Sequence, residues 1–345
     1  MKLKDFVIFN PRETLSKSKK YRKISMDQIK PFTRKIESNI FLKYSGGSKF
    51  RNGDTIFARI TPCLENGKTS FVSCLEKNEV AFGSTEFIIV RSKPSVSLPL
   101  FVYYLMVSKK IRDKAIISMT GSSGRERVQQ IALDNIIIPD YTVDYQQHIV
   151  NTIGSIDDLI ENYDKQLEKI KIILRDKYKS YDNLNKIKLG DVATIKTGKL
   201  NADACCQNGI YPFFTCSEKP LNINVYAFDG PSILLSGNGS QLGYLNFYDG
   251  KFNAYQRTYV IQSNKIYSIY ASLLCNIDQI INQACGSAIP YITKPMIENL
   301  YIFEFDKITE KIFKILIVKM QHINKEKSLL IKLKQTLLNK YFTNQ

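Results

Sequence analysis

Histidine and paired cysteines are scarce in this sequence, and each scarcity argues against a class of chemistry. The 345 residues include two histidines, seven cysteines and no tryptophan. Histidine is a frequent general base and metal ligand, but His148 and His322 each precede an apolar residue in a helical pattern, so we expect both to be structural. The cysteines are odd in number and scattered, without a C-x-x-C pair. They predict reduced thiols, and neither a disulfide framework nor a metal site.

Motifs for nucleotide binding and for DNA cleavage are also missing. Residues 67–69 (GKT) would fit the end of a phosphate-binding loop, but Pro62 stands where the loop needs its first glycine and has no backbone N–H to offer. Residues 237–240 (GNGS) follow an apolar run without a clear helix after it, which favours a tight turn over a cofactor loop. An acidic residue two positions before a lysine, the pair with which many nucleases hold a metal ion, occurs only once, at Asp249 and Lys251 with a glycine between them. The sequence therefore predicts no catalytic residues.

Long hydrophobic runs are absent as well, whereas positive charge is abundant. No run of about 18 uncharged apolar residues occurs, and residues 1–6 (MKLKDF) lack the apolar core of a signal peptide, so we expect a cytoplasmic protein without a membrane partner. Lys and Arg number 49 against 32 Asp and Glu, a formal net charge of +17. With 44% hydrophobic residues and a length that suits two or three domains, the sequence predicts folded domains with a polyanionic partner, first of all nucleic acid.

Two segments have the apolar spacing of long amphipathic helices, with apolar residues at alternating intervals of four and three. The first predicted helix covers residues 144–188, follows Pro139 and has Asp144 as its predicted N-cap. Its seam consists of Ile149, Ile153, Ile156, Ile160, Tyr163, Leu167, Ile170 and Leu174. The second predicted helix covers residues 307–345, and Lys327 interrupts its apolar stripe. Its seam consists of Ile312, Leu316, Met320, Ile323, Leu330, Leu333 and Leu337.

The two helices match each other at a constant offset of 163 residues, which indicates an internal repeat. Each follows a longer segment, residues 1–143 and residues 189–306, in which short runs of Val, Ile, Phe and Tyr alternate with Gly, Asn and Pro. The sequence thus predicts an α+β fold with a pseudo-twofold repeat, in which two globular domains are separated by two long antiparallel helices that form a coiled coil. The net charge is +12 over residues 1–143 and −2 over residues 189–306, so DNA binding by the second segment would need a local patch and neutral donors.

Several motifs, present in this order and duplicated, resemble those of the specificity subunits of Type I restriction-modification enzymes. The resemblance covers nearly the whole chain. The motifs are residues 53–62 (GDTIFARITP) with 65–68 (ENGK), residues 82–87 (FGSTEF), the domain openings at 3–6 (LKDF) and 189–192 (LGDV), residues 233–239 (ILLSGNG), and the helix entry from residues 138–139 (IP) to 146–149 (QQHI). The sequence departs from the family pattern in lacking a lead-in before the first domain and in diverging from Pro220 onward.

The resemblance implies a DNA-recognition subunit that is not an enzyme. Two target recognition domains (residues 1–143 and 189–306), each followed by a spacer helix (144–188 and 307–345), would bind a bipartite target in double-stranded DNA. Members of this family recruit two methyltransferase subunits, which carry S-adenosylmethionine and methylate adenine, and restriction subunits then join for cleavage. The chain itself is therefore expected to bind no cofactor. The apolar stripe of the first helix continues to Tyr181, and its length of about 33 residues from Ile149 would be roughly 50 Å, the length of about 15 base pairs.

We predict DNA contacts at basic and amide residues in turn-rich segments, because Arg and Lys bind phosphate or guanine and side-chain amides can read adenine. The predicted residues are Arg59, Lys68, Arg125, Arg127, Lys199, Asn238, Gln241, Gln256, Arg257 and Lys294. Ordinary salt bridging is the competing interpretation for each basic position. Outer helix faces are predicted to help dock the methyltransferases, with a merely solvated surface as the alternative. These faces contain Asp157, Asp158, Glu161 and Lys165 in the first helix and Lys314, Lys325 and Lys332 in the second.

Two other functions are compatible with the sequence. One is a specificity subunit that serves a Type IIB- or Type IIG-like methyltransferase-nuclease, and the identity of the partner chains that co-purify would distinguish it. The other is a coiled-coil scaffold whose mixed domains bind other proteins, and failure to bind duplex DNA in the presence of the methyltransferase would indicate it. The recognised bases are not readable, because the recognition domains have no residue-to-base code.

Overall fold

The computed structural model describes residues 1–181, 185–217, 219–286 and 289–343. The chain divides into two units: unit 1 consists of Met1–Tyr163 and Lys327–Gln345, and unit 2 consists of Asp164–Glu326. The division cuts through the two long helices, α5 (Val143–Lys179) and α9 (Lys307–Thr343), so each unit contains part of both helices together with its own strands. The domain boundaries predicted from the sequence lie at the helix ends instead.

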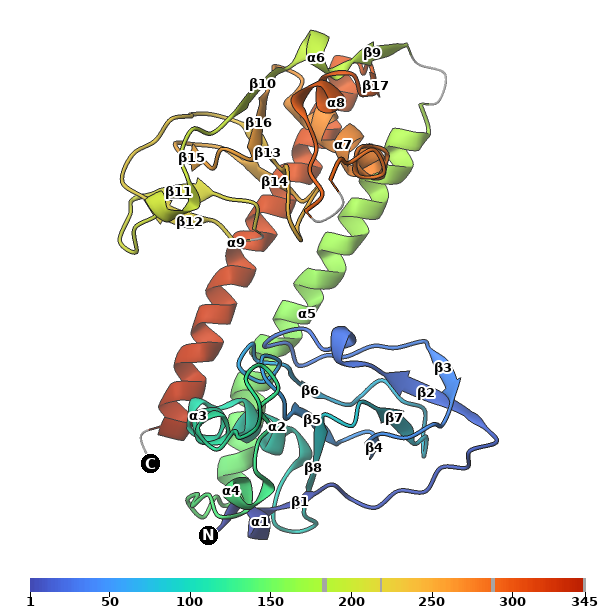
Figure 1. The fold of residues 1–345 in the computed structure, drawn as a ribbon, viewed down its shortest axis with the longest axis vertical. Coiled ribbons are helices and arrows are strands. Elements are labelled where there is room, and N and C mark those ends of the chain that lie inside the picture. The colour runs from blue at the N-terminus through green and yellow to red at the C-terminus, as the bar shows by residue number, and fades with distance from the viewer. Residues whose placement is uncertain (182–184, 218, 287–288, 344–345) are drawn as a thin grey trace. The chain divides into compact units, whose positions relative to one another are not determined.

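Unit 1 contains two four-stranded sheets of short strands (Figure 1). The first sheet is antiparallel throughout and has the strand order β1 (Val7–Phe9), β8 (Phe87–Ser92), β5 (Thr55–Ala58) and β6 (Thr69–Phe71). The second sheet has the order β3 (Phe41–Lys43), β2 (Lys20–Ile24), β7 (Ala81–Gly83) and β4 (Lys49–Phe50). In that sheet β2 pairs with β3 antiparallel and with β7 parallel, which makes β3 an edge strand.

The helices of unit 1 cover its sheets and form most of its core. They are α1 (Leu3–Phe6), α2 (Pro99–Val107), α3 (Lys109–Ile117) and α4 (Gln130–Asp134), with a 3-10 turn, η1, at Met26–Gln28. All seven residues from Phe101 to Val107 are buried, as expected of a helix that is apolar on every side. Ile149 of α5 and Phe342 of α9 belong to the same core cluster, so packing against α2 fixes both long helices within unit 1.

Unit 2 repeats this arrangement. Its main sheet has the order β10 (Thr194–Thr197), β16 (Thr258–Gln262), β13 (Ser232–Ser236) and β14 (Leu245–Tyr248), and a smaller sheet contains β12 (Leu221–Ile223), β11 (Tyr211–Phe214) and β15 (Asn253–Ala254). β9 (Lys186–Lys188) pairs with β17 (Tyr301–Phe303). The remaining elements are α6 (Leu189–Val192), η2 (Ala202–Ala204), α7 (Ile266–Ile281) and α8 (Lys294–Glu298). The α+β class and the internal repeat agree with the prediction.

Equivalent hydrogen bonds show how closely the repeat is kept. The Arg59 amide donates to the Glu86 carbonyl at 3.0 Å in unit 1, and the Gly237 amide donates to the Arg257 carbonyl at 2.9 Å in unit 2. The next bond in each frame joins the Val128 amide to the Arg59 carbonyl, and correspondingly the Ile292 amide to the Gly237 carbonyl. The two units therefore share one backbone frame with different side chains on it.

The predicted antiparallel course of the two helices is present within unit 1. The His148 ring and the Tyr341 hydroxyl are 3.1 Å apart, and the Lys334 ammonium donates to the Asp157 carboxylate at 2.6 Å. Residue numbers rise along α5 while those of their partners fall along α9, which is the antiparallel direction. Within unit 2 the turn that follows α5 meets the first turn of α9, where the Tyr181 and Thr309 hydroxyls are 2.9 Å apart.

The structure places the seam residues unequally. Ile149, Ile153, Ile156, Ile170, Leu174, Met320 and Ile323 are buried, and Ile160, Tyr163, Leu167, Leu316, Leu330 and Leu337 are half-buried. Ile312 and Leu333, however, are exposed by 37% and 47%, while the adjacent Phe313 and Lys334 are buried. The inward face of α9 is therefore rotated by one residue from the predicted one at these positions.

The predicted repeat offset of 163 residues is accordingly wrong, and the structure gives 164. Gln146 and Glu310, which are 164 residues apart, have the same role, because each accepts hydrogen bonds from backbone amides at the start of the preceding core helix. The apolar pattern predicted the wrong offset because Ile312 and Phe313 are adjacent and only one of them can face inward. The inward position of Lys334 could not be predicted from apolar spacing, because lysine is a charged residue.

Candidate nucleic-acid interface

The ends of β13 and β16 bring several predicted residues of unit 2 to one edge. Ser236 and Thr258 are directly paired, so the loop that follows β13 and the turn that precedes β16 lie side by side. The Gly237 amide binds the Arg257 carbonyl so closely that a Cβ at Gly237 would come within 2.4 Å of that oxygen. Only glycine fits this approach. The GNGS segment opens the loop of residues 237–244 that joins the antiparallel strands β13 and β14, so it connects two strands, as the sequence predicted, through a longer loop than a tight turn.

Five of the six residues predicted for the second domain lie on the loops of this edge. The Gln256 amide donates to the Leu200 carbonyl at 3.0 Å, which joins the 199–200 segment to the turn that carries Arg257. The residues are Lys199, Asn238, Gln241, Gln256 and Arg257, of which Asn238 is half-buried and the other four are exposed. Tyr291 lies beside them through its backbone bridge to Asn238. We call this group the unit 2 edge.

Arg257 is held by its backbone, and its side chain is exposed. Its carbonyl accepts the Gly237 amide and, at 3.3 Å, the Cys216 thiol. Among the residues that the structure describes, no carboxylate forms an ion pair with its guanidinium. Lys294, the sixth predicted residue, begins α8 and pairs with Glu298 at 3.2 Å. The available cations of the edge are therefore Arg257 and Lys199.

The corresponding edge of unit 1 contains Arg59, Glu86 and Arg127, and we call it the unit 1 edge. The Arg127 guanidinium donates to the Glu86 carboxylate at distances of 2.7 to 3.1 Å. This hydrogen bonding lowers the pKa of Glu86 below its ordinary value. Arg59 is half-buried, and its Nε has no hydrogen-bond partner among the described residues. Arg125 lies in the neighbouring loop, is exposed, and contributes its carbonyl to Arg127.

Lys68 is less available for a DNA contact than the sequence predicted. It is half-buried, and its ammonium donates to the Met26 carbonyl at 2.8 Å, which fastens the η1 turn to the loop before β6. Gly67, just before it, has φ of +77°, and a Cβ there would come within 2.5 Å of the Phe32 ring. The GKT segment thus serves packing within unit 1.

The predicted docking face on α5 needs correction. Asp157 is buried, where its carboxylate accepts hydrogen bonds from Lys334 and from the Tyr104 hydroxyl. Asp158 and Glu161 accept hydrogen bonds from Arg34 at 2.5 and 2.9 Å. These three carboxylates therefore bind within unit 1, because oppositely charged groups pack against that side of α5. Lys165, Lys314, Lys325 and Lys332 are exposed.

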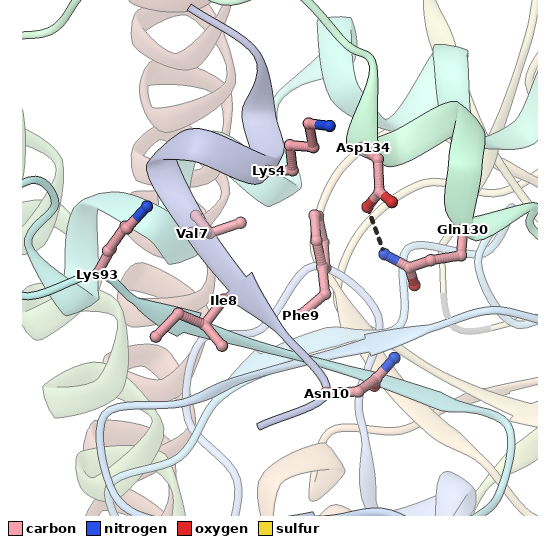
Figure 2. A pocket seen from close by; sticks show the side chains of 8 residues that line it. All are labelled: Lys4, Val7, Ile8, Phe9, Asn10, Lys93, Gln130 and Asp134. Carbon is pink, nitrogen blue, oxygen red and sulfur yellow. Dashed lines mark hydrogen bonds between the residues drawn. The ribbon is translucent and has the colours of Figure 1, made fainter. Parts of the chain in front are cut away.

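Each unit also has a hollow beside the first strand of its main sheet. The hollow in unit 1 has a volume of about 450 Å³, and Figure 2 shows Lys4, Lys93 and the hydrogen-bonded pair of Gln130 and Asp134 at its wall, together with apolar side chains. A second hollow of about 550 Å³ lies in unit 2 along residues 190–194 and 262–265. The described residues that line them do not place a nucleophile beside a base. In the described part of the chain, no three His, Cys, Asp or Glu residues are grouped so as to hold a metal ion.

One basic surface was not predicted from the sequence. Lys17, Lys19, Lys20 and Lys43 are exposed on β2, β3 and the turn before β2. The run KSKKYRK at residues 17–23 was the available signal. Helices long and apolar enough to cross a membrane are not found in the described residues.

Comparison with known proteins finds relatives among the specificity subunits of Type I restriction enzymes. Residues 181–333 match the family model of the Type I restriction modification DNA specificity domain. The specificity subunit of the Type I restriction enzyme EcoDI of Escherichia coli is 46% identical over 118 residues, which cover 34% of this chain and 26% of the relative. The MjaIX specificity subunit of Methanocaldococcus jannaschii is 26% identical over 250 residues, 59% of this chain and 57% of the relative. The chain thus spans about a quarter of the first relative and just over half of the second.

A solved structure has the same fold. The S subunit of a Type I restriction-modification system from M. genitalium superposes with a TM-score of 0.63 and 16% sequence identity, covering 100% of this chain and 96% of that one. At this level of identity the likeness concerns the fold alone. The likeness in fold covers the whole chain, whereas the family model matches residues 181–333.

Proposed function

We propose that this chain, which is similar in sequence and in fold to Type I restriction enzyme specificity subunits, is a non-catalytic subunit that recognises a bipartite sequence in duplex DNA. The observation that carries the proposal is the repeated edge. One backbone frame presents Arg59, Glu86 and Arg127 in unit 1, and Gly237, Arg257 and Tyr291 at the corresponding positions in unit 2. Two frames with different side chains suit the reading of two different half-sites.

The charge distribution supports a nucleic-acid partner. The chain has a net charge of +17, and the phosphates of DNA contribute most of the sequence-independent affinity of a basic protein. We assign the DNA contacts of unit 2 to Lys199, Asn238, Gln241, Gln256 and Arg257. In unit 1 we assign them to Arg59, Arg125 and Arg127. Lys68 and Lys294 have partners within the chain and are weaker candidates.

The proposed protein partners are two methyltransferase subunits and, through them, restriction subunits. S-adenosylmethionine would be bound by the methyltransferase and by no site of this chain. Exposed apolar side chains on the helices support such docking: Ile308 and Ile315 of α9 are exposed by 71% and 67%. A surface of this kind is commonly an interaction site.

The test is duplex binding by the chain together with a methyltransferase subunit that co-purifies with it. We expect the complex to bind a 45-base-pair duplex that contains its target more tightly than one of scrambled sequence. Affinity should fall steeply between about 0.05 and 0.2 M salt, because phosphate contacts release counterions. Equal affinity for both duplexes would contradict sequence recognition. Absence of any duplex binding would favour the protein-scaffold alternative.

A further inference from the structure

The surface of unit 1 formed by Lys17, Lys19, Lys20 and Lys43, which we call the basic edge, has a feature that ordinary folding does not explain. Lys20 of β2 and Lys43 of β3 are direct partners in the antiparallel ladder. Both are exposed, so two ammonium groups stand opposite each other on neighbouring strands. Like charges in this position destabilise a strand pair. An anion bound between them would remove that cost.

The described part of the chain supplies no such anion. Among the described residues, the basic edge lysines form no ion pairs, and three glutamates of the surrounding segments are already engaged. Glu13 binds Arg51 and Arg91, Glu37 binds Lys35, and Glu79 binds Arg22.

Apolar side chains accompany the charge. Ile40, Phe41 and Leu42, on the edge strand and just before it, are exposed by 46%, 47% and 45%. A surface that combines lysines with apolar groups matches a nucleic-acid backbone, in which charged phosphates alternate with sugars that offer little charge. β3 is an edge strand, so it also leaves this surface open on one side.

The basic edge is continuous with the unit 1 edge. β3, β2 and β7 are neighbours in one sheet, and Gly83 of β7 pairs with Ile24, four residues along β2 from Lys20. Rise along the strand and spacing between strands together put the two surfaces roughly 15 Å apart, close to the roughly 12 Å width of a major groove. β7 ends at Gly83, and the next residue, Ser84, accepts a hydrogen bond from the Glu86 amide at 3.1 Å. Ser84 also accepts the Ser48 amide through its carbonyl, which ties the segment after β3 to the same place. One duplex can therefore contact both surfaces.

We propose that the basic edge of unit 1 binds the phosphate backbone of the same duplex whose bases are read at the unit 1 edge. The proposal rests on the proposed function. The basic edge would contribute affinity that does not depend on the DNA sequence. Lysine ammonium groups bind phosphates as point charges and fix the position of unit 1 on the duplex, whereas the bases are read at the unit 1 edge.

The test uses the full chain with its methyltransferase partner and two variants. In the double variant Lys20→Gln, Lys43→Gln, two phosphate contacts are lost, so the slope of log affinity against log salt should fall by about 2. Affinity at about 0.15 M salt should fall roughly tenfold to thirtyfold, by the same factor for target and scrambled duplexes. The single variant Lys20→Glu places opposite charges across the ladder. It should therefore raise the melting temperature of the chain by roughly 1–2 °C while it weakens duplex binding.

The matched control is Lys311→Gln, Lys319→Gln, which removes the same charge from exposed positions on α9. We expect it to change the salt slope by less than half a unit. The proposal is overturned, while the proposed function stands, if the double variant Lys20→Gln, Lys43→Gln keeps the wild-type salt slope. The same holds if the control variant loses as much duplex affinity as this double variant. Loss of binding to polyglutamate without loss of duplex binding would also overturn it, because the surface would then serve an acidic protein. If the wild-type complex itself binds no duplex, the proposed function fails, and this inference with it.

Discussion

Arg127 and Arg257 provide a guanidinium at the equivalent edges of the two units from different positions in the frame. Arg257 stands where unit 1 has Glu86, and Tyr291 stands where unit 1 has Arg127. In unit 2 the positive charge therefore comes from Arg257 in the turn before β16. In unit 1 it comes from Arg127, in the loop between α3 and α4. In unit 1 the carboxylate of Glu86 also orients the guanidinium through two nitrogens, a geometry that holds a planar group well.

Glu86→Gln tests this orienting role. The substitution removes a negative charge from the unit 1 edge and leaves Arg127 with a weaker partner. We expect the affinity for scrambled duplex and its salt slope to rise, and the preference for the target duplex to fall. The control is Glu304→Gln, which breaks a comparable exposed pair with Lys265 in unit 2. Unchanged preference for the target in Glu86→Gln would show that the pair is only a surface salt bridge.

The pH dependence of this pair has a definite sign. The folded-state pKa of Glu86 is lowered by Arg127, so its contribution to stability is present above the unfolded pKa, about 4.3, and is lost as the pH falls through the lower folded value. Between pH 6 and 8 the carboxylate stays ionised. The difference in duplex preference between wild type and Glu86→Gln should therefore be constant over that range.

Gln146 and Glu310 show how far a residue can be predicted from sequence. Both bind backbone amides at the start of a buried helix, one as a neutral amide and one as a carboxylate. Burial raises the pKa of Glu310 despite the amides that stabilise its charge. Their equivalence was invisible in the sequence because the apolar pattern aligned the helices one residue out of step.

At the scale of elements, periodicity predicted both long helices, and the structure shows them over Val143–Lys179 and Lys307–Thr343. Periodicity could not fix the rotation of α9, because apolar residues occur in adjacent pairs such as Leu337 and Leu338. It also could not find Lys334, which is buried because it binds the buried Asp157. A charged pair inside an apolar seam depends on two helices meeting and has no signature in either one alone. The same holds for Glu86 and Arg127, which are 41 residues apart.

The Asp157–Lys334 pair gives a prediction for the helix packing of unit 1. Lys334→Met should destabilise unit 1 by roughly 3 kcal/mol, because it leaves a buried carboxylate without its cation. The double variant Asp157→Leu, Lys334→Leu should recover most of that loss, since an apolar pair often replaces a buried ion pair without cost. Denaturant unfolding of the full chain measures both. Glu168→Gln, which breaks an exposed pair with Lys171, serves as the control.

For this packing prediction, a Lys334→Met variant as stable as Glu168→Gln would contradict the account. It would mean that the Tyr104 hydroxyl alone satisfies Asp157. A double variant that is less stable than Lys334→Met would show instead that the pair is needed for a unique register, a role known for buried polar groups in coiled coils.

At the scale of the whole molecule, duplication and divergence explain the sequence better than any single site does. The two units share the strand order of their main sheets and their key backbone hydrogen bonds, yet residues 1–143 are strongly basic and residues 189–306 are slightly acidic. Unit 1 accordingly offers a basic edge beside the loops that we propose read DNA, whereas the proposed surface of unit 2 depends on a few cations, amides and tyrosines. Side chains on the loops are free to change because the frame is maintained by backbone groups and glycine.

Sequencing of methylated adenines in cells that make this chain together with the proposed methyltransferase partner tests the central claim most directly. The account predicts methylation within a two-part motif. Substitution of Glu86 and Arg127 together by alanine should relax only one part of the motif, and Arg257→Ala should relax only the other. If both sets of substitutions altered the same part, or if neither altered the motif, the two edges would not be independent readers of DNA.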